Sequence, residues 1–199
     1  LDKAIADYTA AIDLDPDYNA AYNNRGICYK NLGQYENAIA DYTTAIDLDP
    51  NDRRAYNNRG WVFNKLGRYE DAIADYSTVL EIDPDYVSAY NNRGISYKNQ
   101  ERYEDAIADF SKIMEIAPNY IYAYNNRGWI FNEQGRYEDA VADFSLSIKL
   151  NPGDAAAYNY RGDAYDGLQR FDEAIADYTT AIEINPGYGL AYENRGNVY

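Results

Sequence analysis

The chain has 199 residues, 46% of them hydrophobic, and 33 acidic against 18 basic side chains give it a formal net charge of −15. Nucleic acids and anionic membrane surfaces attract basic proteins, and no apolar run approaches the roughly 20 residues of a membrane span, so neither partner is expected. The chain has no histidine and a single cysteine, Cys28, which excludes an intrachain disulfide and argues against an enzyme, a metal site or a cofactor.

The first residues already show a helical pattern. Residues 1–18 match the second half of later segments, so we expect a lone second helix of a partial repeat. Residues 19–52 then form a complete unit. Asp17, just before it, is the predicted N-cap of its first helix, and Gly33 is the predicted left-handed end of that helix. A second helix is predicted from Tyr35 to Leu48, where apolar residues recur at helical spacing, and Pro50 stops it.

The same short sequence motif recurs along the chain every 34 residues. The sequence Ala-Tyr-Asn-Asn-Arg-Gly begins at Ala21 and returns at Ala55, Ala89 and Ala123, with drifted copies at Ala157 and Ala191. The further complete units are 53–86, 87–120, 121–154 and 155–188, followed by a truncated first helix at 189–199. A fixed period of this length predicts an all-α solenoid, in which each unit buries its apolar face against its neighbours.

The repeated residues resemble the tetratricopeptide repeat family over the whole chain. In the first unit the matching residues are Tyr22, Gly26, Tyr29, Ala38, Tyr42, Ala45 and Pro50. The resemblance implies a right-handed superhelix of antiparallel helix pairs, whose first helices line a concave groove. Glycine at position eight and alanine at position twenty let paired helices approach closely, while the aromatic residues fill the gaps between them.

Position seven departs from the commonest family pattern, because arginine stands there in every copy. These residues are Arg25, Arg59, Arg93, Arg127, Arg161 and Arg195. An equally regular aspartate follows on the second helix, at Asp41, Asp75, Asp109, Asp143 and Asp177. We predict a ladder of partly buried Arg–Asp pairs, which specifies register more than it adds stability and removes the arginines from ligand contact.

Asparagine pairs form the main candidate binding surface on the first helices. They are Asn23 and Asn24, Asn57 and Asn58, Asn91 and Asn92, and Asn125 and Asn126, continued in part by Asn159 and Asn194. An amide both donates and accepts, so a column of amides can hold a peptide backbone of any sequence. The columns are similar to the asparagine ladder in the tetratricopeptide superhelix of O-linked N-acetylglucosamine transferase. Alternatively, one asparagine of each pair only bonds a neighbouring helix or loop.

Position nine alternates as Ile27, Trp61, Ile95 and Trp129, which indicates a larger period of 68 residues. If Trp61 and Trp129 face the groove, they can anchor apolar side chains of a partner. The alternative is that they lie flat against neighbouring helices and fill space.

The charged residues expected in the groove follow a pattern of their own. The early part carries Lys30, Arg54, Lys65 and Lys98, and the late part carries Glu133, Asp163, Asp166 and Glu193. This pattern predicts a polarised groove that orients an extended ligand.

These features favour a non-catalytic scaffold that binds an extended peptide or protein segment in its concave groove. Two alternatives remain: a substrate-recruiting segment of a larger enzyme, or a structural scaffold that assembles by itself. Because the chain begins and ends within a repeat, we expect a piece of a longer repeat protein, with head-to-tail stacking through its ends. The compartment stays open, with the cytoplasm favoured.

Overall fold

The computed structural model describes all residues from 1 to 199, and its regular secondary structure is entirely helical. The helices, in chain order, are α1 (Asp2–Leu14), α2 (Asn19–Asn31), α3 (Tyr35–Leu48), α4 (Arg53–Lys65), α5 (Tyr69–Ile82), α6 (Val87–Asn99), α7 (Tyr103–Ile116), α8 (Ile121–Glu133), α9 (Tyr137–Leu150), α10 (Ala155–Gly167), α11 (Phe171–Ile184) and α12 (Gly189–Val198). The predicted all-α class and the predicted bounds of α3 are confirmed.

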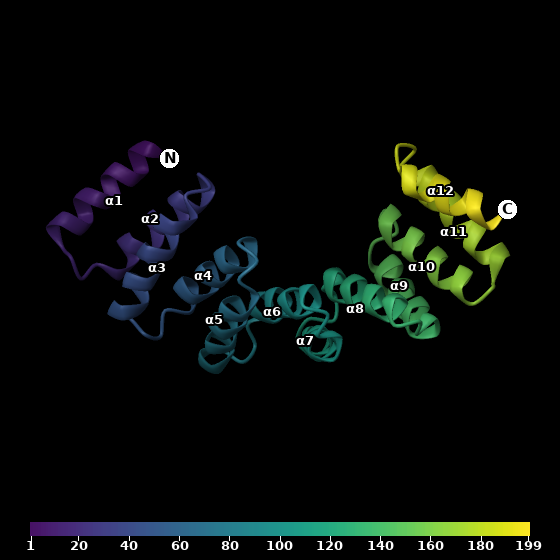
Figure 1. Cartoon of the computed structure of the whole chain (residues 1–199), viewed down its shortest axis with the longest axis horizontal. Helices are drawn as coiled ribbons and strands as arrows, with labels where there is room; N and C mark the ends of the chain where they lie inside the picture. Colours follow the sequence, from purple (N-terminus) through teal and green to yellow (C-terminus); the bar gives the residue numbers. More distant parts are fainter. The chain divides into compact units, whose positions relative to one another are not determined.

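The helices form two compact units. Unit 1 comprises residues 1–102 with α1 to α6, and unit 2 comprises residues 103–199 with α7 to α12 (Figure 1). The boundary lies between the two helices of the repeat at 87–120. Unit 1 therefore contains two complete repeats flanked by a second helix and a first helix, and unit 2 has the same composition.

Within each unit, the two helices of one repeat pack as an antiparallel pair. The most extensive contacts join α2 to α3 and α4 to α5 in unit 1, and α8 to α9 and α10 to α11 in unit 2. First helices also touch the first helix of the next repeat, as α2 touches α4 and α8 touches α10, whereas α3 and α5 do not meet, nor do α9 and α11. The layer in which successive helices approach each other is the inner side of a curve. The first helices therefore line the concave face of each unit.

The core of each pair consists of small residues facing an aromatic ring. The alanines at position twenty, such as Ala38 and Ala174, are fully buried, and so is the ring of Tyr42. A Cβ atom added at Gly26 would lie 2.7 Å from Cε1 of Tyr42, and one at Gly162 would lie 2.6 Å from Cε1 of Tyr178. A methyl group at such a seam overpacks it, which costs about 1–3 kcal/mol. The close approach that the repeated glycine predicts is confirmed at these positions.

The helix ends follow two rules, one of which was predicted wrongly. After the first helices, Gly33, Gly67 and Gly135 adopt positive φ angles of 70–73°, as predicted for Gly33. At the start of α2, however, the predicted N-cap Asp17 is wrong. Tyr18 occupies the N-cap position without a side-chain hydrogen bond, because α2 begins only at Asn19.

The corresponding position in two other repeats does hold a capping aspartate. Asp52 accepts hydrogen bonds from the backbone N–H groups of Arg54 and Ala55 at the start of α4. Asp154 does the same for Ala156 and Ala157 at the start of α10. These caps satisfy backbone donors that a helix leaves open at its first turn.

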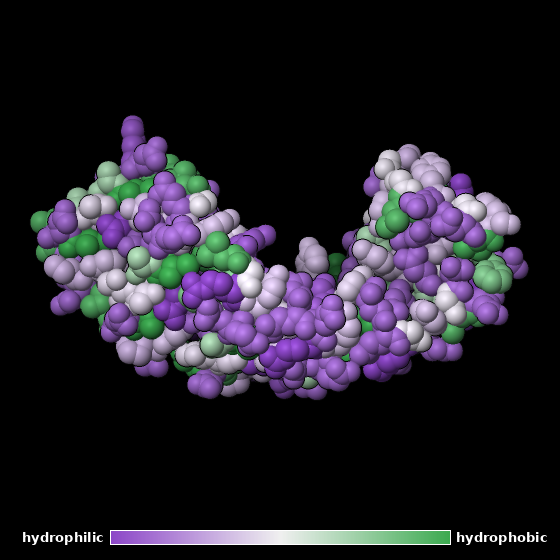
Figure 2. Space-filling model, in the orientation of Figure 1, coloured by the Kyte–Doolittle hydropathy of each residue, from purple (hydrophilic) through white to green (hydrophobic).

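The face seen in Figure 2 is mostly hydrophilic, and hydrophobic residues (green) interrupt it over α1 to α3. Leu14, Tyr18 and Leu48 are among the exposed large apolar side chains of this region, with exposed fractions of 88%, 50% and 36%. No helix combines the length and hydropathy that a membrane-crossing segment requires.

Candidate functional site

The position-seven arginines cross-link the helices beneath the concave face. Nε and Nη2 of Arg59 lie 2.9 and 2.7 Å from the two carboxylate oxygens of Asp75. The same two-bond pairing joins Arg25 to Asp41, Arg127 to Asp143 and Arg161 to Asp177. Hydrogen bonds to Asp143 raise the pKa of Arg127, and burial raises the pKa of Asp143. The predicted Arg–Asp ladder is confirmed for these four pairs.

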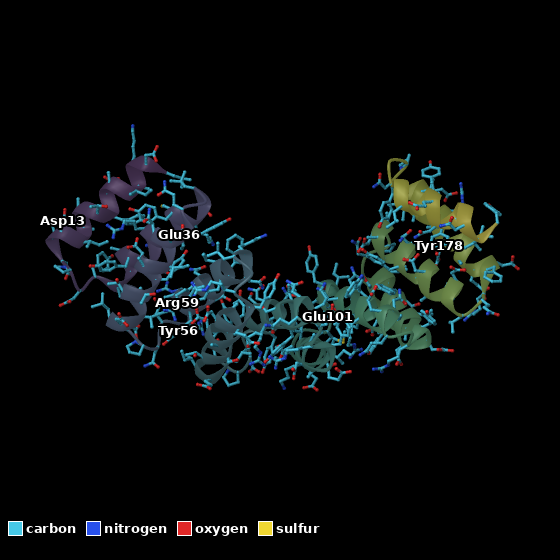
Figure 3. All side chains as sticks on the ribbon, in the orientation of Figure 1. Asp13, Glu36, Tyr56, Arg59, Glu101 and Tyr178 are labelled. Carbon is cyan, nitrogen blue, oxygen red and sulfur yellow. The ribbon has the colours of Figure 1, made fainter.

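A third contact of the same arginines was not predicted. Nη1 of Arg59 donates to the hydroxyl of Thr43 on the preceding second helix, at 3.0 Å. Equivalent bonds run from Arg25 to Thr9, Arg93 to Ser77, Arg127 to Ser111, Arg161 to Ser145 and Arg195 to Thr179. The guanidinium groups of the four Arg–Asp pairs thus link their own first helix to the second helices on both sides. Figure 3 shows Arg59 beside Tyr56, whose ring centroid lies 5.7 Å from its Cζ atom. These arginines serve packing and register.

The asparagine pairs are divided between packing and surface. Asn23 is only 4% exposed, and its Oδ1 accepts a hydrogen bond of 3.2 Å from Nδ2 of Asn58 on the next first helix. Asn194 repeats this contact with Asn159, which is fully buried. For Asn23 the structure therefore favours the alternative interpretation, in which one asparagine of the pair bonds a neighbouring helix.

The remaining amides of the two columns are half-buried. Nδ2 of Asn125 donates to the capping carboxylate of Asp154, and Nδ2 of Asn126 donates to the backbone carbonyl of Tyr122. Oδ1 is buried without a hydrogen-bond partner in the protein at Asn57, Asn91 and Asn125. Asn24 and Asn92 complete the set, and Nδ2 of Asn91 donates to Oδ1 of Asn92 at 3.4 Å. The amides therefore do not form one uniform exposed row.

The predicted basic residues of the groove occupy different environments. Arg54 is largely exposed, with its Nε 3.5 Å from Oδ1 of Asp52. Lys30 and Lys98 are half-buried, and burial lowers the pKa of both ammonium groups. Lys65 is exposed and lies over a tryptophan ring. Of these four side chains, Lys30 and Lys65 lie over the ring of Trp61, and the polarised groove stays a prediction.

Unit 1 holds a pocket of about 270 Å³ between the first helices α4 and α6. Its lining consists of Trp61, Asn64, Lys65, Tyr76, Asn92, Ile95 and Asn99. Nδ2 of Asn64 donates to Oγ of Ser96 at 2.7 Å, which ties the two helices together beside the pocket. Nζ of Lys30 lies 5.1 Å and Nζ of Lys65 5.3 Å from the centroid of Trp61, so two cations cover this ring.

Unit 2 holds a pocket of about 290 Å³ at the equivalent place, between the first helices α8 and α10. Its lining consists of Trp129, Asn132, Glu133, Tyr137, Tyr160 and Asp163. Nδ2 of Asn132 donates to the backbone carbonyl of Tyr160 at 2.9 Å and ties α8 to α10. Trp129 and Trp61 stand at the same place in the 68-residue period, and each is half-buried with one part lining a pocket. Each tryptophan ring is therefore partly packed between helices and partly turned toward a pocket, so neither interpretation accounts for the whole ring.

Among the residues that line the unit 2 pocket, Asp163 has the pKa that departs most from its usual value. Its Oδ1 accepts hydrogen bonds from the hydroxyl of Tyr178 at 2.9 Å and from Nδ2 of Asn194 at 2.8 Å. Burial raises the pKa of Asp163 to about 6, and the nearby Asp166 adds to the rise. Tyr178 lies on α11 (Figure 3), and burial followed by the charge of Asp163 raises the pKa of its hydroxyl.

Several pocket residues were missing from the predicted site. Asn64 and Asn132 are at position twelve, where the sequence alternates between lysine and asparagine. Tyr160 stands where the earlier repeats have asparagine, and this departure from the repeat is the sequence feature that could have pointed to the pocket. Tyr137 comes from a second helix, and its ring lies over Gly167 at the end of α10, where an added Cβ would be 2.5 Å from Cζ of the ring. That contact depends on the packing of two helices, so no sequence pattern pointed to it.

Comparison with protein families agrees with the repeat architecture. The family model described as tetratricopeptide repeat matches residues 20–52, 87–120, 121–154 and 155–188, which together exceed half of the chain. A second model of that description matches residues 41–74, and one described as TPR repeat matches residues 1–33 and 60–101. No curated protein sequence matches the chain.

Solved structures share the fold. YrrB, described as a TPR protein with an unusual peptide-binding site, is 22% identical with a TM-score of 0.81, and the match covers 95% of this chain and 97% of YrrB. MamA is 24% identical with a TM-score of 0.79, covering 84% of this chain and 92% of MamA. A tetratricopeptide repeat protein from Parabacteroides merdae ATCC 43184 is 25% identical with a TM-score of 0.79, covering 98% of this chain and 77% of that protein. With its repeats, helix pairs and family matches, the chain belongs to the tetratricopeptide repeat family.

Proposed function

We propose that this protein is a non-catalytic interaction scaffold that binds an extended peptide segment on the concave, first-helix face. The observation that carries the proposal is the equivalent pocket in each unit, formed between two successive first helices beside a half-buried tryptophan. Aromatic anchors in pockets contribute much of the binding energy of protein interfaces.

The size and lining of the pockets suit single side chains of a peptide. Volumes of about 270 and 290 Å³ lie just below the range for pockets that hold whole small-molecule ligands, which is roughly 300–1,000 Å³. Amides such as Asn92 and Asn132 line them, and amides can hydrogen-bond the peptide backbone next to a seated side chain. The similarity in fold to YrrB, which has a peptide-binding site, is consistent with this function.

A random-peptide display selection on the full chain tests the proposal. The parent is compared with a variant in which Trp61→Ala and Trp129→Ala remove the aromatic wall of both pockets. A matched control variant carries Glu36→Ala and Asp172→Ala, which change exposed carboxylates on the second helices α3 and α11 (Figure 3 labels Glu36). Circular dichroism confirms that all three proteins are helical before the selection.

We expect enrichment of peptides on the parent and the control variant and loss of enrichment on the tryptophan variant. Equal enrichment on all three proteins would move the binding site to another surface. The absence of enrichment on the parent would overturn the peptide-binding function itself.

A further inference from the structure

The unit 2 pocket differs from the unit 1 pocket in the charge of its lining. Glu133 replaces Lys65 at the same repeat position, and Asp163 replaces Ile95. Two carboxylates therefore line the unit 2 pocket, and no basic side chain does.

The unit 2 pocket also has more aromatic surface. Tyr160 takes the place of Asn92, and its ring stacks on the core ring of Phe144 with centroids 5.7 Å apart. Tyr137 reaches the pocket because Gly167 offers no Cβ atom, whereas unit 1 has Asn99 at this position. Together with Trp129, three aromatic side chains surround a space that two carboxylates make negative.

The carboxylate of Asp163 is held in place before any ligand arrives. Tyr178 and Asn194 both donate to its Oδ1, while its Oδ2 has only a long contact of 3.4 Å with Nδ2 of Asn159. Glu133 adds a second carboxylate to the lining, and its side chain is exposed. The lining thus offers acceptors to a ligand that brings several donors.

Burial makes the ionised form of Asp163 less favourable than it is in water, which raises the pKa of this carboxyl to about 6. A cation seated in the pocket would offset that cost, because an opposite charge stabilises the ionised carboxyl. Aromatic rings attract cations through their faces, and planar guanidinium groups also stack on them.

We propose that the unit 2 pocket is a receptor for a cationic side chain, an arginine or a lysine, of the bound peptide. The inference refines the proposed function by giving one pocket a ligand class, and it rests on that function only for the source of the side chain. The unit 1 pocket provides the contrast. Lys30 and Lys65 already lie over Trp61, so a further cation would be repelled there.

The two tryptophans of the chain allow each pocket to be followed separately. In the Trp61→Phe variant of the 199-residue chain, Trp129 is the only tryptophan and reports on the unit 2 pocket. Nα-acetyl-arginine amide is titrated into this protein, and Nα-acetyl-citrulline amide serves as the neutral probe of nearly the same shape. The reciprocal Trp129→Phe variant reports on the unit 1 pocket through Trp61.

We expect the fluorescence of Trp129 to saturate with the arginine probe at a concentration at least tenfold lower than with the citrulline probe. Adding Glu133→Gln and Asp163→Asn to the Trp61→Phe protein is expected to weaken arginine binding at least tenfold. Glu133→Gln alone changes an exposed side chain, so it tests the proposal even if Asp163→Asn disturbs folding. For this single change we expect a weakening of about threefold or more.

Equal responses to arginine and citrulline would overturn the proposal, and so would an unchanged affinity in Glu133→Gln, or an equal response of Trp61 in the reciprocal variant. The outcome is separable from that of the display selection. Peptide enrichment without arginine binding would remove only the charge preference of the unit 2 pocket. Arginine binding without peptide enrichment would leave the cation pocket in place and remove the peptide function.

Discussion

The two units build the same frame and line it differently. In both, the arginine of position seven joins three helices, and a fully buried ring packs against a glycine. At the pocket, unit 1 presents Lys65 and Ile95 where unit 2 presents Glu133 and Asp163. These varying positions face the space between successive first helices, whereas the Arg–Asp pairs and the glycine seams lie beneath it. Chemistry can therefore change from one pocket to the next while the repeat is kept.

The largest effect is expected from a change to the common frame. Arg59→Ala in unit 1 and Arg161→Ala in unit 2 each leave an aspartate that is 5–6% exposed without its counter-ion. Breaking a buried ion pair from one side costs about 3–5 kcal/mol, so both variants should lose this much in chemical denaturation followed by circular dichroism.

The control is a double replacement of one pair, Arg59→Met with Asp75→Leu. Removing both charges spares the protein a buried unpaired carboxylate, so most of the lost stability should return. If one arginine variant lost much unfolding free energy and the other lost none, the Arg–Asp pairs would not contribute equally to the stability of the two units.

The next largest effect is the loss of a buried tyrosine hydroxyl, which should destabilise the protein in unit 2 but not in unit 1. The hydroxyl of Tyr178 donates to Asp163, so Tyr178→Phe is expected to destabilise the protein by about 2 kcal/mol, the value for a hydrogen bond to a charged group. The hydroxyl of Tyr76 is buried without a partner in the protein, so Tyr76→Phe should be neutral or stabilise by up to about 1 kcal/mol. Thermal unfolding of both variants measures the difference, and the same sign for both would contradict the structure.

Only unit 2 should show a pH response at its pocket, because unit 1 has Ile95 in place of Asp163. In the folded state burial raises the pKa of Asp163 to about 6, above the value of 3.8 that is usual for aspartate. The folded state therefore binds this proton more tightly than the unfolded state. The resulting stability is fully present below about pH 4 and is lost as the pH rises through about 6.

Between pH 4 and 7.5 we expect the parent to lose about 1–2 kcal/mol of unfolding free energy relative to Asp163→Asn, as measured by urea denaturation. This is less than the full linkage value, because solvent reaches part of the carboxyl. Protonation would also remove a charge from the pocket and weaken arginine binding below pH 6. Parallel pH profiles for the two proteins would show that another group titrates.

The smallest effect should be equal in both units. Glu101 and Gln169 adopt φ angles of 58° and 59° at the helix end where Gly33, Gly67 and Gly135 adopt similar angles. Side chains with a Cβ atom disfavour this left-handed region by about 1–2 kcal/mol. Glu101→Gly and Gln169→Gly should each stabilise the protein by about 0.5–1 kcal/mol, after the greater chain entropy of glycine is subtracted. Gly33→Ala is the reverse control and should destabilise it.

Much of the frame was predictable because it repeats. The arginine at position seven and its aspartate recur in every complete 34-residue repeat, so the pairing of Arg25 with Asp41 could be inferred from periodicity alone. The bond from Arg25 to Thr9 was missed, because the hydroxyl lies one repeat earlier and belongs to threonine in some repeats and to serine in others. Asp17 was misplaced as a cap because the exact first residue of a helix depends on how the preceding turn closes.

The sequence by itself determined the helix pairs, their 34-residue period, the close-packed glycine seams and the alternation of the two tryptophans, because these features depend on local periodicity and side-chain size. The tertiary structure alone decided which amides are buried and which line a pocket. Asn23 pairs with Asn58, and Tyr137 enters a pocket beside Gly167, only after neighbouring helices have docked. Such contacts depend on distances of a few ångströms between helices, and these distances are set by packing that no single residue position records.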